Sequence, residues 1–128
     1  MPKYLIEARY VGTGVEGLLK EGGSRRRVAI DELFKSVGGS VEAFYYAFGD
    51  RDVIVIGTLP DNATAAALAY KVNASGVVDC RTIVLMTPEE IDTAVAKSSR
   101  YRPPGAEVDE AEVAKWDSEG GHPAPGLG

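Results

Sequence analysis

The chain has 128 residues, a usual length for one domain and long enough to bury a core without disulfide bonds. Hydrophobic residues make up 45% of it and charged residues 26%, and the net charge of −5 excludes a broad basic surface for nucleic acid. One cysteine excludes an internal disulfide framework, and one histidine excludes a His/Cys zinc site within a single chain. With no signal-like or membrane-length apolar stretch, the sequence predicts a cytoplasmic protein without a membrane partner, metal or cofactor.

The first half of the chain predicts three strands. Residues 3–10 alternate between two faces, as a half-buried strand does. Two short helical segments follow, separated by Gly22 and Gly23. Residues 41–48 and 52–59 are aromatic or β-branched, and the short loop between them predicts an antiparallel hairpin.

The second half predicts a helix, a strand and another helix. An alanine-rich helix begins after Asp61 and ends near Gly76, and residues 77–86 form the fourth strand. Thr87 and Glu90 have the spacing of a capping box, which predicts a short final helix. The resulting β-α-β-β-α-β order is the ferredoxin-like arrangement of the α+β class. It predicts a four-stranded antiparallel sheet with two helices on one face and nothing on the other.

The composition changes after the last predicted helix. We expect residues 1–100 to form the domain and residues 101–128 to be a Pro/Gly-rich, acidic extension. The extension contains Trp116, the only tryptophan, and an exposed tryptophan is unusual in a solvated tail. We therefore expect Val113 and Trp116 to dock on the domain or on a neighbouring subunit.

Several sequence blocks, taken in order, resemble one known family. PKYLIEARY, GLLKEGGSRRR, EAFYYAFGDRDVIVI, LPDNATAAALA and YRPPG resemble the GYD-domain family over residues 2–105. The resemblance implies a fold of the dimeric α+β barrel type and a homo-oligomer, and it leaves the reaction open. The family's Gly-x-Tyr-Asp element matches Gly49 and Asp52, and Arg51 stands where the tyrosine is expected.

The hairpin turn carries two carboxylates for which two roles are open. Asp50 and Asp52 can accept hydrogen bonds from the local backbone, as aspartates in turns often do. They can also form a carboxylate pair at the rim of a cavity, where they would bind a cation or accept a proton. The sequence does not decide between the two roles.

Strand alternation predicts which side chains share the uncovered sheet face. If Tyr4 faces the helices, Glu7 and Arg9 face the other way, and the same alternation places Arg81 of the fourth strand beside them. It also places a row from the second strand on that face: Glu42, Phe44, Tyr46 and Phe48. A face that mixes charges with aromatics suits a half-polar cavity between two subunits, although cross-strand ion pairs in solvent would also account for the charges. The candidate ligand-pocket residues are Glu7, Arg9, Glu42, Tyr46, Asp50, Asp52 and Arg81. The candidate interface residues are Phe44, Phe48 and Trp116.

Three hypotheses for the function follow, and they leave open whether the chain is an enzyme. The first is a homo-oligomer that binds a small anionic or aromatic ligand between sheet faces. The second is a cofactor-independent oxygenase or isomerase of the dimeric α+β barrel kind. The third is a scaffold or cargo protein that docks through its C-terminal tail.

Overall fold

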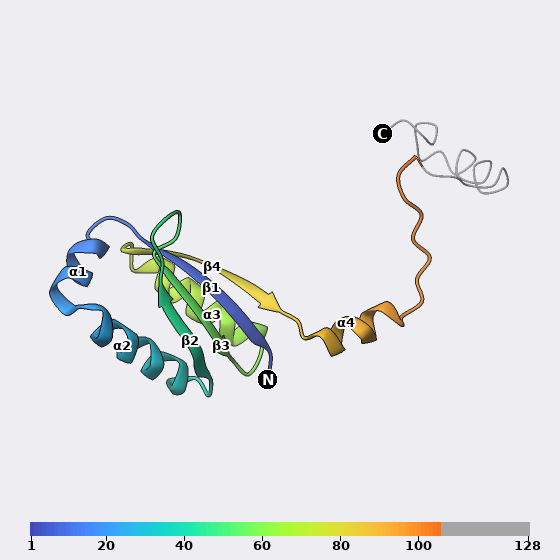
Figure 1. Ribbon diagram of the computed structural model, residues 1–128, viewed down its shortest axis with the longest axis horizontal. Helices are drawn as coiled ribbons and strands as arrows, with labels where there is room; N and C mark the ends of the chain where they lie inside the picture. Colours follow the sequence, from blue (N-terminus) through green and yellow to red (C-terminus); the bar gives the residue numbers. More distant parts are fainter. Residues whose placement is uncertain (106–128) are drawn as a thin grey trace. The chain divides into compact units, whose positions relative to one another are not determined.

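A computed structural model describes residues 1–105 and confirms the predicted α+β fold. The strands are β1 (Lys3–Tyr10), β2 (Ser40–Tyr46), β3 (Val53–Thr58) and β4 (Val78–Leu85). They form one sheet in the order β2-β3-β1-β4, and every neighbouring pair is antiparallel (Figure 1). This order is expected for the ferredoxin-like arrangement, because the connection from β1 to β2 passes over β3 and the connection from β3 to β4 passes over β1.

The four helices begin and end largely at the predicted signals. They are α1 (Gly14–Glu21), α2 (Gly23–Ser36), α3 (Asn62–Ala74) and α4 (Pro88–Val95). Asp61 caps α3, because its Oδ1 accepts a hydrogen bond of 2.8 Å from the backbone N–H of Thr64. The capping box of α4 is confirmed by reciprocal bonds of 3.0 and 3.1 Å between Thr87 and Glu90.

The hydrophobic core lies between the sheet and helices α2 and α3, and Figure 1 shows α3 behind the sheet. Tyr4 of β1 and Leu59 are fully buried, and the Tyr4 hydroxyl donates to Asn62 Oδ1 at 2.6 Å. The ring of Phe34 lies directly over Gly57, where a Cβ atom would approach it to 2.7 Å. Glycine therefore permits the close packing of α2 on β3.

A β-bulge in β2 reverses part of the predicted alternation. Val41 pairs with Gly57 and Ala43 pairs with Ile56, so Glu42 is an extra residue in the strand. The prediction that Phe44 faces the uncovered side is therefore wrong: its ring is 9% exposed and belongs to the core.

Tyr46 and Phe48 are also placed differently from the prediction. The Tyr46 hydroxyl donates to the carbonyl of Gly23 in α2 at 3.0 Å, so this side chain faces the helices as well. Strand β2 ends at Tyr46, and Phe48 lies fully exposed in the following loop. The aromatic row expected on the uncovered face is therefore reduced to Tyr45, which is 69% exposed.

Residues 1–91 form one unit, and residues 92–105 belong to a second unit that is not placed relative to the first. The predicted boundary between residues 100 and 101 stays a prediction, and the predicted docking of Val113 and Trp116 lies outside the described residues. Within residues 1–105, no helix has the length and apolar character required to span a bilayer.

Candidate functional site

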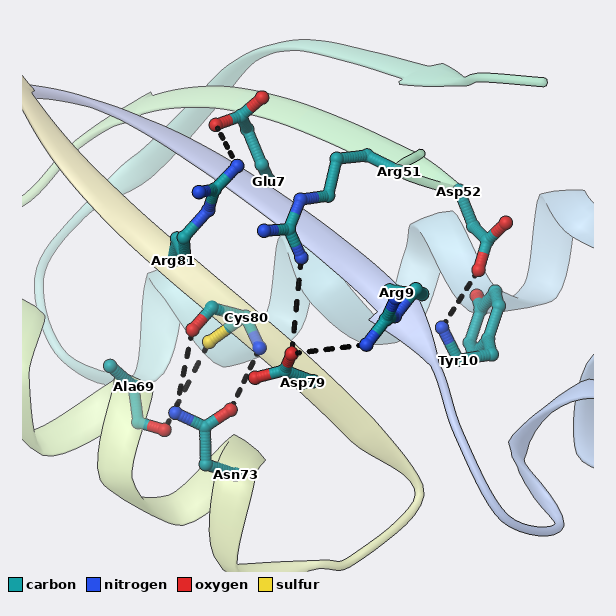
Figure 2. A network of polar contacts seen from close by, with 10 residues as sticks. All are labelled: Glu7, Arg9, Tyr10, Arg51, Asp52, Ala69, Asn73, Asp79, Cys80 and Arg81. Carbon is teal, nitrogen blue, oxygen red and sulfur yellow. Dashed lines mark hydrogen bonds and ion pairs between the residues drawn. The ribbon is translucent and has the colours of Figure 1, made fainter. Parts of the chain in front are cut away.

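Charged side chains from β1, β4 and the β2–β3 loop meet on the uncovered face, the side of the sheet opposite α2 and α3 (Figure 2). Glu7 and Arg81 are direct cross-strand partners, as are Arg9 and Asp79. The ion pairs join Arg81 to Glu7 at 3.6 Å, Arg9 to Asp79 at 3.8 Å and Arg51 to Asp79 at 3.9 Å. The predicted positions of Glu7, Arg9 and Arg81 on one face are confirmed.

The other predicted carboxylates lie elsewhere. Glu42 pairs with Lys3 at 2.8 Å, near the end of β1 opposite to Arg9. Asp52 Oδ2 accepts a hydrogen bond of 2.8 Å from the backbone N–H of Tyr10, which ties the hairpin to the end of β1. Asp50 is exposed and has no ion pair with any described residue. The structure therefore favours the turn role for Asp52 and does not bring the two aspartates together at one site.

Arg51 is a member of the charged group that sequence reasoning missed. Its side chain leaves the β2–β3 loop and lies across the sheet, with its guanidinium group directed at Asp79 (Figure 2). Strand alternation could not identify it, because Arg51 precedes β3 and its direction depends on the folded loop. The only signal in the sequence is a lone cation within a short hairpin loop.

The opposite face of the sheet contains an apolar hollow of about 90 Å³ between α2, α3 and the central strands. Its floor includes Ile6 and Ala8, which face the helices yet are only half-buried. Leu33 of α2 and Leu68 of α3 contribute to its walls. Residues on central strands that face helices are normally covered completely, so the space above them can accept an apolar group.

A second, more polar hollow of about 240 Å³ adjoins the first. Both hollows are lined by Tyr10, Arg26 and Val78, and the second extends toward α1 and Glu21. Because these three residues line both, the apolar hollow and the polar hollow form one continuous cleft. An apolar chamber with a few convergent polar groups is the usual form of a small-molecule site.

Arg26 and Tyr10 line both hollows where they join, and Tyr46 lies close to these two residues without lining either hollow. The Arg26 side chain is 28% exposed, and its guanidinium group lies 3.7 Å from Glu21, beyond hydrogen-bond range. Burial raises the pKa of Tyr46, and the nearby Tyr10 raises it further, while Arg26 lowers it. The Tyr46 hydroxyl therefore stays protonated at neutral pH and acts as a donor.

The wall formed by α3 is attached to β4 through Asn73 (Figure 2). Its side-chain amide accepts from the backbone N–H of Cys80 at 2.8 Å and donates to the same residue's carbonyl at 3.5 Å. These bonds satisfy backbone groups at an edge strand, where no further strand supplies partners. Burial raises the pKa of the Cys80 thiol, so this side chain lines the apolar hollow as a neutral group.

Comparisons with known proteins give one match. The family described as GYD domain matches residues 4–95, which covers the strands and helices of residues 1–105 except for Lys3, the first residue of β1. No curated protein and no solved structure was found to match the chain. Within residues 1–105, no three His, Cys, Asp or Glu side chains are grouped as metal ligands.

Proposed function

The chain belongs to the GYD domain family, and we propose that it binds a small, largely apolar molecule in the cleft between α2, α3 and the sheet. The observation that carries the proposal is the apolar hollow over Ile6 and Ala8, which leaves the centre of the helix-covered face incompletely filled. Apolar surface gains about 25 cal/mol per Å² on leaving water, so filling this hollow with an apolar group is favourable.

The polar end of the cleft indicates the second part of the ligand. Among the described residues, no side-chain hydrogen bond satisfies the guanidinium group of Arg26, and its ion pair with Glu21 is long. Such a group favours a carboxylate or another oxygen anion. The ligand class that fits both ends is a compact aromatic or aliphatic acid.

Ligand-observed ¹⁹F NMR with 4-fluorobenzoate tests this proposal. We expect the full chain to broaden the fluorine resonance. Ala69→Met should abolish the broadening, because Ala69 lines the apolar hollow and the longer side chain would occupy it. Ala67→Met is the matched control, because Ala67 is exposed on the same helix. Equal broadening by the two variants, or none by the unmodified chain, would contradict the proposal.

We also propose that the chain forms a homo-oligomer through the uncovered face. Leu5, Ile54 and Ile56 are half-buried on that face, and Tyr45 and Ile83 are 69% and 42% exposed. A sheet face that exposes such apolar side chains among its ion pairs can be covered by a second copy. Phe44 offers little surface for such an interface because it is in the core, while Phe48 is exposed.

Sedimentation velocity on two variants of β4 tests self-association. Ile83→Glu places a charge on the uncovered face, and Val84→Glu places one on the opposite side at an equally accessible position. We expect the unmodified chain to sediment as a dimer or larger species at micromolar concentration. Only Ile83→Glu should shift the sedimenting species toward the monomer. A monodisperse monomer of the unmodified chain would overturn the proposed self-association.

A catalytic role is the second candidate, and the protonated Tyr46 hydroxyl near Arg26 is the observation that favours it. A cofactor-independent isomerase or oxygenase could use Arg26 to hold an acidic substrate, and the Tyr46 hydroxyl could turn from the Gly23 carbonyl to donate a hydrogen bond to that substrate. Tyr46→Phe would then retain fluorobenzoate binding and lose turnover of the substrate. If Tyr46→Phe turned over such a substrate at the unmodified rate, Tyr46 would have no catalytic role.

A further inference from the structure

Arg51 is unusual among the arginines of the uncovered face because its side chain is largely buried, including the guanidinium nitrogen Nε. Its side chain is 16% exposed, compared with 54% for Arg9 and 62% for Arg81. Figure 2 shows the Arg51 side chain lying over the sheet between the Glu7–Arg81 pair and Arg9. A charge held in this way loses part of its hydration.

The described residues do not replace that hydration with hydrogen bonds. Arg51 Nε is buried and has no partner, and the nearest Asp79 oxygen is 3.9 Å from Nη1, too far for a hydrogen bond. Asp79 is also shared with Arg9 at 3.8 Å. A buried guanidinium nitrogen without a hydrogen-bond partner is costly, and a bound ion or water beside the group is one way to offset that cost.

The ion-paired side chains around Arg51 carry an excess of one positive charge, because the neighbouring Asp52 is turned to the backbone N–H of Tyr10 and Asp50 forms no ion pair with a described residue. Three guanidinium groups, those of Arg9, Arg51 and Arg81, surround the two carboxylates of Glu7 and Asp79. The strand on the other side of β1, β3, presents Ile54 and Ile56 here and adds no carboxylate. The Lys3–Glu42 pair is internally balanced and lies toward the other end of β1.

We propose that the uncovered face binds an oxyanion, a carboxylate or phosphate group, through Arg51 with Arg9 and Arg81 beside it. The guanidinium fork can hold two oxygens of one such group at once. An anion at this place would accept hydrogen bonds from the terminal nitrogens of Arg51 and neutralise the excess charge. The site lies on the face opposite the cleft, so the inference goes beyond the ligand proposed for the cleft and does not depend on it, while it shares the uncovered face with the proposed self-association.

Thermal unfolding of the full chain in inorganic phosphate, acetate or chloride at equal ionic strength tests the proposal. We expect phosphate, acetate or both to raise Tm by about 4 °C or more above chloride when the anion is well above its Kd. The responding salt identifies which oxyanion the site prefers. No difference between the three salts would overturn the proposal.

Substitutions of Arg51 separate an anion site from a structural role. Arg51→Met keeps an apolar stem and should lose the anion-dependent rise, while its Tm in chloride should equal or exceed that of the unmodified chain. Arg51→Lys keeps the charge but not the fork and should show a smaller rise. An anion-dependent rise that persists in Arg51→Met would overturn the proposal, and so would a Tm in chloride well below that of the unmodified chain.

Two controls test whether the anion binds at Arg51 rather than elsewhere on the chain. Arg25→Met removes an exposed arginine from the start of α2, and its anion response should equal that of the unmodified chain. A response lost in Arg25→Met would place the anion at that helix instead and overturn the proposal.

Deleting residues 106–128 tests whether the acidic extension occupies the site. A response that appears only after the deletion would mean that the chain's own carboxylates bind Arg51, which contradicts the proposal.

Discussion

The hydroxyl of Tyr46 donates a hydrogen bond to the backbone carbonyl of Gly23 at 3.0 Å and so joins the end of β2 to the start of α2. A Cβ atom at position 23 would lie 3.0 Å from the Tyr46 ring, which shows how closely the two segments approach. The contact lies about one helical turn before Arg26, which lines both hollows of the cleft.

Tyr46→Phe should therefore lower the free energy of unfolding by about 0.5–1 kcal/mol, the usual net contribution of one partly exposed hydrogen bond. Urea unfolding measures the change. Tyr70→Phe is the control, because Tyr70 is 73% exposed and its hydroxyl has no partner among the described residues. Equal stability of the two variants would show that the Gly23 contact contributes nothing.

The bulge in β2 predicts very different losses of stability when each of two neighbouring aromatic residues is replaced by alanine. Phe44→Ala should lower the free energy of unfolding by about 3–5 kcal/mol, because it opens a cavity in the core. Tyr45→Ala should cost less than about 1 kcal/mol, because Tyr45 is 69% exposed. Denaturant unfolding of both variants at one protein concentration makes the comparison. A larger loss for Tyr45→Ala would contradict the position of the bulge.

The same bulge shows why the fold was predictable from the sequence while part of the site was not. The alternation in β1 and the caps of α3 and α4 are local, so Tyr4, Asp61 and Thr87 were placed correctly from sequence alone. A bulge adds one residue without a required glycine or proline, and Val41 to Phe44 contain neither. Strict alternation therefore placed Phe44 on the wrong face.

The cleft and the Arg51 contact depend on distances between elements that are remote in the sequence. The apolar hollow exists because α2 and α3 leave space above Ile6 and Ala8, and helix spacing is not encoded in any one segment. Likewise, Arg51 reaches Asp79 only after β3, β1 and β4 have assembled in their order. The sequence supplied the residue types for both features but not their positions.

Two glycines should respond oppositely to alanine. Gly57→Ala places a Cβ atom 2.7 Å from both the Phe34 ring and the Ser40 carbonyl, so we expect a loss of about 1–3 kcal/mol. Gly17→Ala has open space within α1 and should gain about 0.5–1 kcal/mol from the reduced entropy of the unfolded chain. Thermal unfolding measures both. If Gly57→Ala were as stable as the unmodified chain, the close packing of α2 on β3 would be wrong.

Asp61 should make stability depend on pH at the acid end. Hydrogen bonds from the Thr64 hydroxyl and backbone N–H lower the pKa of Asp61 below its usual value. A carboxyl whose pKa is lower in the folded state stabilises the fold above its unfolded pKa, and this contribution is lost as pH falls through the folded pKa. Asp61→Asn keeps an N-cap but does not titrate, so its stability should fall less between about pH 5 and pH 2. Parallel curves for the two proteins would contradict this role.

The rate at which Cys80 is alkylated gives a chemical test of the apolar hollow. The side chain is 8% exposed and lines the apolar hollow, and burial raises the pKa of its thiol. Because the thiolate is the reactive form, iodoacetamide should alkylate the folded chain at pH 7 at least about tenfold more slowly than the urea-unfolded chain. Mass spectrometry of timed samples gives both rates.

Fluorobenzoate and Ala69→Met should each slow the folded-state reaction further by filling the space beside the thiol, while Ala67→Met should not. A folded-state rate equal to the unfolded rate would show that Cys80 is open to solvent, and the apolar hollow would then be wrong.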